Sequence, residues 1–127
     1  MAQLEAIGIV TADMAESCRF YRTLGLDVPE PEERGQHFEI TLPGGLRLMW
    51  DDVAMIKEID PDWQQPSGQR TSLAFRCADP ADVDATHKRI VEAGFESAME
   101  PWDAFWGQRY AQVVDPDGAK VDLFAPL

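Results

Sequence analysis

The chain has 127 residues, enough for one domain with a single core, and its 23 acidic and 11 basic side chains give a net charge of −12. Because the basic residues are scattered, the sequence lacks the footprint that nucleic acid or an anionic membrane surface requires. It has no basic, apolar leader and no apolar run near the roughly 20 residues that span a bilayer. Two distant cysteines, Cys18 and Cys77, indicate reduced thiols, so we expect a soluble, cytoplasmic protein.

The first half of the chain predicts one strand, one helix and three further strands. Asp13 is placed to cap the helix and Gly25 to end it, and a Pro/Gly turn at Pro43 joins the last two strands. The predicted elements are the strand 4–11, the helix 14–24, a short strand at 26–28, and the hairpin strands 36–42 and 46–50. Residues 53–70 follow as a predicted linker with one helical turn near Val53–Ile59.

The second half of the chain repeats the pattern of the first. The corresponding positions are Ile7 and Leu73, Ile9 and Phe75, Asp13 and Asp79, and Leu24 and Ile90. The closing hairpin, Tyr110–Pro126, turns at Asp-Pro-Asp-Gly, and its Pro116 and Gly118 repeat Pro43 and Gly45 of the first hairpin. A βαβββ module used twice predicts an α+β fold, with eight strands in one curved, mixed sheet and the helices on its outer side.

The repeat also predicts the domain organisation and the two faces of the sheet. We expect a single domain over 1–127, with module one at 1–52, the linker at 53–70 and module two at 71–127. Side chains alternate between the faces of a strand. The apolar set, which we assign to the helix-covered core, is Ile7, Ile9, Phe38, Ile40, Leu42, Leu46, Leu48, Leu73, Phe75, Cys77, Val113, Val121 and Leu123. The mixed, polar set, which we assign to a concave cup or to solvent, is Ala6, Gly8, His37, Glu39, Thr41, Arg47, Met49, Ser72, Ala74, Arg76, Tyr110, Gln112, Lys120, Asp122 and Phe124.

Two motifs connect this pattern with a known family. The segment Asp13–Gly25 has the form D-M-x-x-S-x-x-F-Y-x-x-L-G, and Asp115–Phe124 has the form D-P-D-G-x-x-V-D-L-F. With the doubled module, they make the chain similar to the vicinal oxygen chelate superfamily, which contains glyoxalase I, extradiol dioxygenases, and fosfomycin- and bleomycin-resistance proteins. The resemblance implies this fold and a homodimer. It leaves function open, because the superfamily spans isomerases, dioxygenases, transferases and metal-free binding proteins.

The resemblance also identifies the positions where metal-using members hold a divalent ion. Those members use His or Gln from the first strand of a module and Glu from its last strand. The matching positions here are Ala6, Ser72, Met49 and Asp122. Since three protein ligands are the usual minimum for zinc and only Asp122 is a carboxylate, we expect no metal cofactor at these positions.

Other polar residues offer a rearranged site. His37 and Glu39 share a strand face, and with Asp122 they can in principle form a set of two carboxylates and one histidine. We favour the simpler interpretation that His37 is a solvated residue near a strand end. His87 is predicted to lie on the exposed side of the second helix. No pairing of a nucleophile with a base is evident, so no catalytic residue is assigned.

Aromatic residues near the closing hairpin are the candidate ligand contacts. Trp102, Phe105, Trp106 and Tyr110 fall in a predicted loop and strand start, where flat rings can stack on a planar ligand. They can equally close the end of the core or fill a dimer interface, where Trp and Tyr are enriched. Trp50 is assigned to core packing rather than to a ligand, whereas Trp63 in the linker can cap the cup or join a subunit contact.

Polar side chains complete the predicted binding site. Arg76 and Arg47 can pair with an anionic group of a ligand, or instead neutralise Glu39 and Asp122 across the sheet. Tyr110 and Gln112 can orient a ligand through hydrogen bonds. The full predicted ligand-binding set is Trp102, Phe105, Trp106, Tyr110, Gln112, Arg76, Arg47, Met49 and Asp122.

Three functions remain open from the sequence. The leading one is a metal-independent binding protein, similar to the bleomycin-resistance proteins, that holds an aromatic or amphipathic small molecule in the cup without a cofactor. The second is an enzyme of the same superfamily, a lyase, isomerase or dioxygenase, that uses Asp122, Glu39 and His37. The third is a domain that serves only for association.

Overall fold

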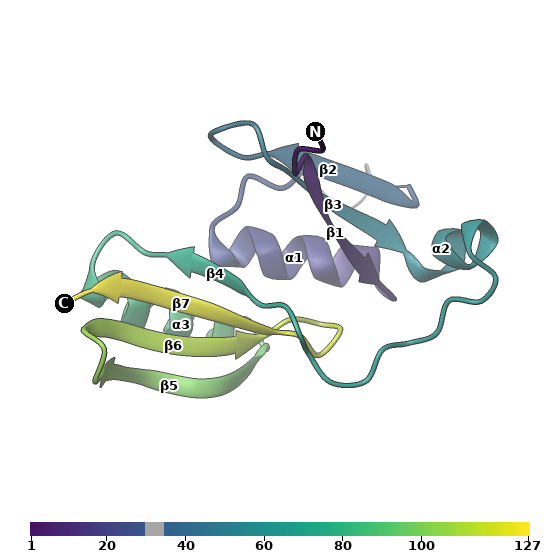
Figure 1. The fold of residues 1–127 in the computed structure, drawn as a ribbon. Coiled ribbons are helices and arrows are strands. Elements are labelled where there is room, and N and C mark those ends of the chain that lie inside the picture. Colours follow the sequence, from purple (N-terminus) through teal and green to yellow (C-terminus); the bar gives the residue numbers. More distant parts are fainter. Residues whose placement is uncertain (30–34) are drawn as a thin grey trace. The chain divides into compact units, whose positions relative to one another are not determined.

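The computed structural model describes residues 1–29 and 35–127, in which the chain forms seven strands and three helices (Figure 1). The fold is α+β, as predicted, and both of its sheets are mixed. In place of the one sheet expected, the described strands form a three-stranded sheet of order β1-β3-β2 and a four-stranded sheet of order β4-β7-β6-β5. The chain divides into two compact units, the first comprising Met1–Arg22 and Leu26–Gln65, the second Thr23–Gly25 and Pro66–Leu127.

The first unit holds the three-stranded sheet. Its elements are β1 (Ala6–Thr11), α1 (Met14–Leu24, apart from its last two residues), β2 (His37–Thr41), β3 (Arg47–Asp52) and α2 (Val53–Ile59). Phe38, Leu48 and Trp50 are buried on one face, as predicted, and Trp50 stacks on Phe38 with 4.6 Å between ring centroids. Tyr21 of α1 packs edge-on against Trp50 at 5.1 Å. Trp50 is therefore a core residue, and α1 supplies part of that core.

Two predictions about the chain between the strands have different outcomes. The helical turn expected near Val53–Ile59 is confirmed as α2, whose first turn is capped by the carboxylate of Asp52. The strand expected at 26–28 is wrong, so the predicted count of eight strands is one too high for the described residues. The Leu26 N–H donates back to Tyr21 at the end of α1, and the Val28 N–H donates to Leu26, so these donors are satisfied locally rather than in a sheet.

The second unit holds the four-stranded sheet. Its elements are β4 (Leu73–Arg76), α3 (Pro80–Glu92), β5 (Glu96–Ala104), β6 (Gln108–Val114) and β7 (Lys120–Pro126). Figure 1 shows α3 behind this sheet, where Val83 and Ile90 are buried with Val113 and Leu123. The predicted closing hairpin is confirmed: β6 pairs antiparallel with β7, and Gly118 takes a φ of 91° in the turn.

Two side-chain placements in the second unit differ from expectation. His87 was predicted to be exposed, but it is 5% exposed, and its Nε2 lies 2.8 Å from Ser97 Oγ. The reason is that β5 packs against α3 and covers that side of the helix. Trp102, predicted in a loop, belongs to β5, and only Phe105 and Trp106 occupy the turn to β6. None of the helices in the described ranges has the length and apolarity needed to cross a membrane.

Candidate functional site

The candidate site lies on the face of the second unit's sheet opposite α3. Register places two rows of side chains directly across the strands. The first row, from β4 to β5, is Arg76, Phe124, Tyr110 and Trp102, and the second is Ala74, Asp122, Gln112 and Met99. We call these eight residues, with Phe105 and Trp106 of the adjoining turn, the second-unit face. The alternation in the sequence assigned Arg76, Tyr110, Gln112, Asp122 and Phe124 to one face, and the register confirms it.

A hydrogen-bonded cluster lies in the middle of this face. The Tyr110 hydroxyl donates to Asp122 Oδ1 at 2.6 Å, and the Gln112 amide donates to the same oxygen at 2.8 Å and to the Tyr110 oxygen at 3.0 Å. Partial burial, together with the neighbouring Asp122 carboxylate, raises the pKa of Tyr110 to about 12. Tyr110 is therefore a neutral phenol at physiological pH, and its proton is committed to Asp122.

Aromatic rings adjoin the cluster and continue to the β5–β6 turn. Trp106 is central, with ring centroids 5.6 Å from Trp102, 5.0 Å from Phe105 and 5.3 Å from Tyr110, all in edge-to-face geometry. The Trp106 indole donates to Gln108 at 2.8 Å, which fixes the orientation of its ring. Trp102, Phe105 and Trp106 are exposed. The predicted grouping of aromatic residues is thus present as one contiguous, solvent-facing surface.

The two arginines of the second unit's sheet differ in their partners. Arg76 is exposed and forms no hydrogen bond or ion pair with any residue in 1–29 or 35–127. Arg109, on the opposite face of β6 from Tyr110, is held by Asp84 at 2.9 Å and by Asp103 at 3.1 Å. The alternative in which Arg76 neutralises Asp122 is not what the structure shows, because Asp122 is held by Tyr110 and Gln112.

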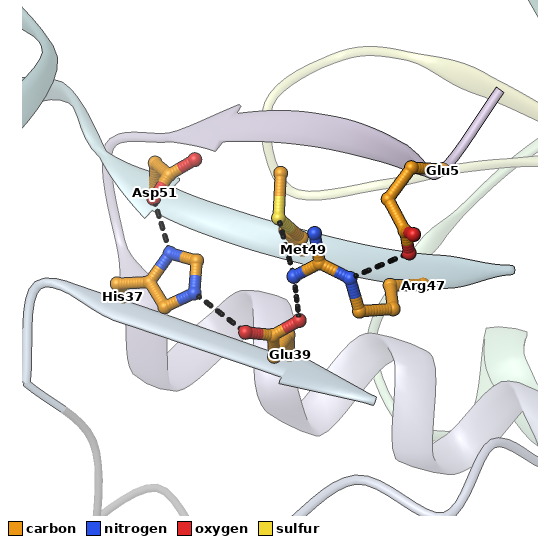
Figure 2. A network of polar contacts seen from close by, with 6 residues as sticks. All are labelled: Glu5, His37, Glu39, Arg47, Met49 and Asp51. Atoms are coloured by element: carbon orange, nitrogen blue, oxygen red, sulfur yellow. Dashed lines mark hydrogen bonds and ion pairs between the residues drawn. The ribbon is translucent and has the colours of Figure 1, made fainter. Parts of the chain in front are cut away.

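A second group of polar residues lies on the exposed face of the first unit's sheet (Figure 2). Arg47 on β3 contacts Glu5 at 3.1 Å and also Glu39 on β2, so the expected pairing of Arg47 with Glu39 is present. His37 Nδ1 lies 2.5 Å from Asp51 Oδ1, and Nε2 lies 3.4 Å from Glu39 Oε1. We call these five residues the first-unit network.

The network's charges perturb each other's titration. The hydrogen bond to Asp51, followed by the one to Glu39, raises the pKa of His37 above its ordinary value. Hydrogen bonds from Arg47 and then His37 lower the pKa of Glu39. Each cation therefore faces a carboxylate, and the three carboxylates outnumber the two cations, so the network keeps a net negative charge. Asp51 was missed from the sequence, although it lies directly opposite His37 in the antiparallel hairpin, where the register could have revealed it.

The family's metal positions in this chain do not fit a divalent ion. Ala6 offers no donor, and the Met49 thioether lies 3.6 Å from the Arg47 guanidinium, a cation where another cation would have to bind. Oδ1 of Asp122 already accepts two hydrogen bonds. No group of three or more His, Cys, Asp or Glu within the described ranges is arranged to hold a metal ion. The set of His37, Glu39 and Asp122 draws on both units and stays a prediction.

Comparison with known proteins agrees with the two sequence motifs. The model of the glyoxalase/bleomycin resistance protein/dioxygenase superfamily matches residues 3–123, so the chain belongs to that superfamily. A comparison with curated proteins gives no significant match. The function of this chain therefore has to be inferred from the geometry of the site.

Solved structures share the fold over nearly the whole chain. A glyoxalase/bleomycin resistance protein/dioxygenase family enzyme from Burkholderia phytofirmans PsJN is 18% identical, with coverage of 99% of this chain and 100% of that chain and a TM-score of 0.84. A glyoxalase/bleomycin resistance protein/dioxygenase from Nocardioides is 25% identical, with coverage of 100% and 85% and a TM-score of 0.74. A glyoxalase-related enzyme from Fulvimarina pelagi is 21% identical, with coverage of 98% and 88% and a TM-score of 0.78. Identities this low support the fold and leave activity open.

Proposed function

We propose that the chain binds a planar aromatic small molecule on the second-unit face, without a metal. The observation that carries this proposal is the adjacency of exposed rings to a fixed hydrogen-bonding cluster. Trp106 contacts Tyr110, and Tyr110 donates to Asp122, so apolar surface and polar groups form one continuous patch. Binding sites for small molecules typically combine apolar and aromatic lining with a few fixed polar groups.

The rings offer affinity, and the cluster offers orientation. Each aromatic contact contributes about 0.5–1.5 kcal/mol beyond the area that it buries. Trp106 is held by Gln108, and Tyr110 by Asp122, so these two side chains lose little rotamer freedom when a ligand binds. Both N–H bonds of the Gln112 amide are used inside the cluster, so its carbonyl oxygen and Oδ2 of Asp122 are the acceptors against which a ligand's donor group would be placed.

The test is a titration followed through the indole N–H signals of the four tryptophans in a ¹⁵N spectrum. With 2-naphthamide as the probe, we expect the Trp102 and Trp106 signals to shift while the signal of the buried Trp50 stays in place. Trp106→Ala should weaken binding about 10-fold or more, because it removes the central ring. Ile59→Ala, which truncates an exposed apolar side chain of α2 in the first unit, is the control and should leave affinity unchanged.

The competing interpretation is that these rings form the interface of the expected homodimer. Sedimentation of the wild type and of Trp106→Ala separates the two, because an interface role predicts dissociation of a dimer on substitution. An unchanged oligomeric state with lost binding supports the proposal. Unchanged binding in Trp106→Ala and Trp102→Ala contradicts it.

A further inference from the structure

We propose that Arg76 receives an anionic group of the ligand, so that the second-unit face selects aromatic acids over neutral or cationic aromatics. This inference rests on the proposed function and adds the class of ligand and the residue that determines it. Arg76 stands at one end of the row that continues through Phe124 and Tyr110 to Trp102. A guanidinium at the end of an aromatic row matches a flat ligand with an acid at one end.

Arg76 is available to a ligand. Arg47 and Arg109, the other arginines within strands, each bind two carboxylates, whereas Arg76 binds none among the described residues. Although the chain has about twice as many acidic as basic side chains, Arg76 has no acidic partner among the described residues. Its five donors and planar shape suit bidentate binding of a carboxylate.

Arg76 stays unpaired because Asp122, the carboxylate of this face, is held by other side chains. Asp122 is the partner of Ala74 in the register, so it lies diagonal to Arg76 across β4 and β7. Its Oδ1 is instead held by the Tyr110 hydroxyl and the Gln112 amide, at 2.6 and 2.8 Å. Two neutral donors thus compensate the carboxylate in place of the guanidinium. The full positive charge of Arg76 therefore remains for a ligand.

The distance between Arg76 and Tyr110 across the sheet suits a bicyclic aromatic acid. Neighbouring strands lie about 4.8 Å apart, so the β4 and β6 backbones at Arg76 and Tyr110 are separated by roughly 10 Å, about the length of a bicyclic aromatic acid. Such a molecule can lie over Phe124 with its ring system against Tyr110 and Trp106 and its acid at Arg76. A neutral analogue of the same shape would keep the ring contacts and lose the charged one.

The experiment compares three probes of one shape: 2-naphthoate, 2-naphthamide and 2-naphthylmethylammonium. For the wild type we expect 2-naphthoate to bind about 10-fold more tightly than 2-naphthamide, because hydrogen bonds between charged partners exceed neutral ones. Arg76→Met keeps the stem and should remove this preference while the affinity for 2-naphthamide changes less than about twofold. Arg76→Lys should restore part of it, since a lysine keeps the charge but not the planar fork.

The matched control is Lys120→Met, which removes the same charge from the same face. Lys120 lies four residues from Phe124 along β7, roughly 13 Å away, so its loss should leave the preference for 2-naphthoate intact. Equal binding of 2-naphthoate and 2-naphthamide by the wild type, or a preference for the ammonium probe, would overturn this inference and leave the proposed function standing. Failure of all three probes to bind overturns both.

Discussion

The two units each contain a cluster of touching aromatic rings. The distances between the rings are similar, but the rings are buried in one cluster and exposed in the other. In the first unit, Trp50 contacts Phe38 and Tyr21 at 4.6 and 5.1 Å, and all three rings are at most 5% exposed. In the second, Trp106 contacts Trp102 and Phe105 at 5.6 and 5.0 Å, yet these rings are 48%, 36% and 91% exposed. Ring contacts alone therefore do not define a core. The sheet face on which the rings lie decides their role.

The charged groups show the same contrast between the units. The first-unit network pairs each of its cations with carboxylates, so no cation of the network is left without an acidic partner. The second-unit face holds Asp122 with neutral donors and leaves Arg76 without a partner among the described residues. One face thus satisfies its own polar groups, and the other leaves rings and a cation for another molecule. The following predictions test this contrast.

The largest expected effect is on stability, and it separates the two aromatic clusters. Trp50→Ala should lower the free energy of unfolding by about 3–5 kcal/mol, because it empties a fully buried site between Phe38 and Tyr21. Trp106→Ala should cost no more than about 1 kcal/mol, since its ring is half exposed. Urea unfolding followed by circular dichroism measures both.

A conservative variant sharpens this prediction. The indole N–H of Trp50 is buried without a hydrogen-bond partner in the described residues, so Trp50→Phe removes no hydrogen bond and keeps an aromatic ring in the stack. We expect it to cost less than half as much as Trp50→Ala. Similar losses for Trp50→Ala and Trp106→Ala would contradict the distinction between a core cluster and a surface cluster.

Much of the fold could be predicted because the sequence repeats the pattern of one module. The cap at Asp79, the turn at Gly118 and the burial of Val113, Val121 and Leu123 all followed from local patterns. The failures have a common cause, which is that a local pattern does not say what covers a segment. Residues 26–28 alternate apolar and charged side chains, which favours a strand, but the amides of Leu26 and Val28 bond locally. The exposure of His87 depends on β5, which packs over α3 from farther along the chain.

The sequence could predict which site residues share a sheet face, but not which charged side chains pair with each other. Strand alternation placed Tyr110, Gln112 and Asp122 together, and the structure confirms their contact. Which carboxylate would hold which arginine depends on the register between strands distant in sequence, such as β4 and β7. Arg47 also recruits Glu5, which precedes β1 and carries no pattern of its own. The ligand contacts themselves remain predictions.

The next prediction concerns Tyr110 and is smaller. Asp122→Asn should lower the pKa of Tyr110 from about 12, because the carboxylate no longer favours the protonated phenol, but burial should keep it above 10.0. Because folding raises the pKa of Tyr110, its protonated phenol stabilises the fold below pH 10, and this contribution is lost as pH rises toward 12. The ¹³Cζ shift of Tyr110 reports the titration, and the buried Tyr21 is the internal control. An unchanged Tyr110 pKa would show that Asp122 is not its partner.

The smallest expected effect concerns His37 and tests whether its imidazole is paired with the carboxylates of the first-unit network. The chain has two histidines, so their ¹H–¹³C signals can be followed separately. We expect the pKa of His37 to exceed 6.5 and to fall in Asp51→Asn, which removes its strongest partner, and to fall less in Glu39→Gln. The His87 signal should not respond, because its partner is Ser97 in the other unit.

The accompanying change in stability has a definite sign. The folded state raises the pKa of His37, so the protonated form stabilises the fold below pH 6.5, and this contribution is lost as pH rises through the raised value. His37 is well exposed, so the effect should stay within the roughly 0.2–1 kcal/mol typical of surface ion pairs, and salt should reduce it. If the pKa of His37 has its ordinary value and does not change in Asp51→Asn, the imidazole is not paired with the Asp51 and Glu39 carboxylates. The first-unit face would then hold charged groups without partners like the second, and the contrast between the two faces would fail.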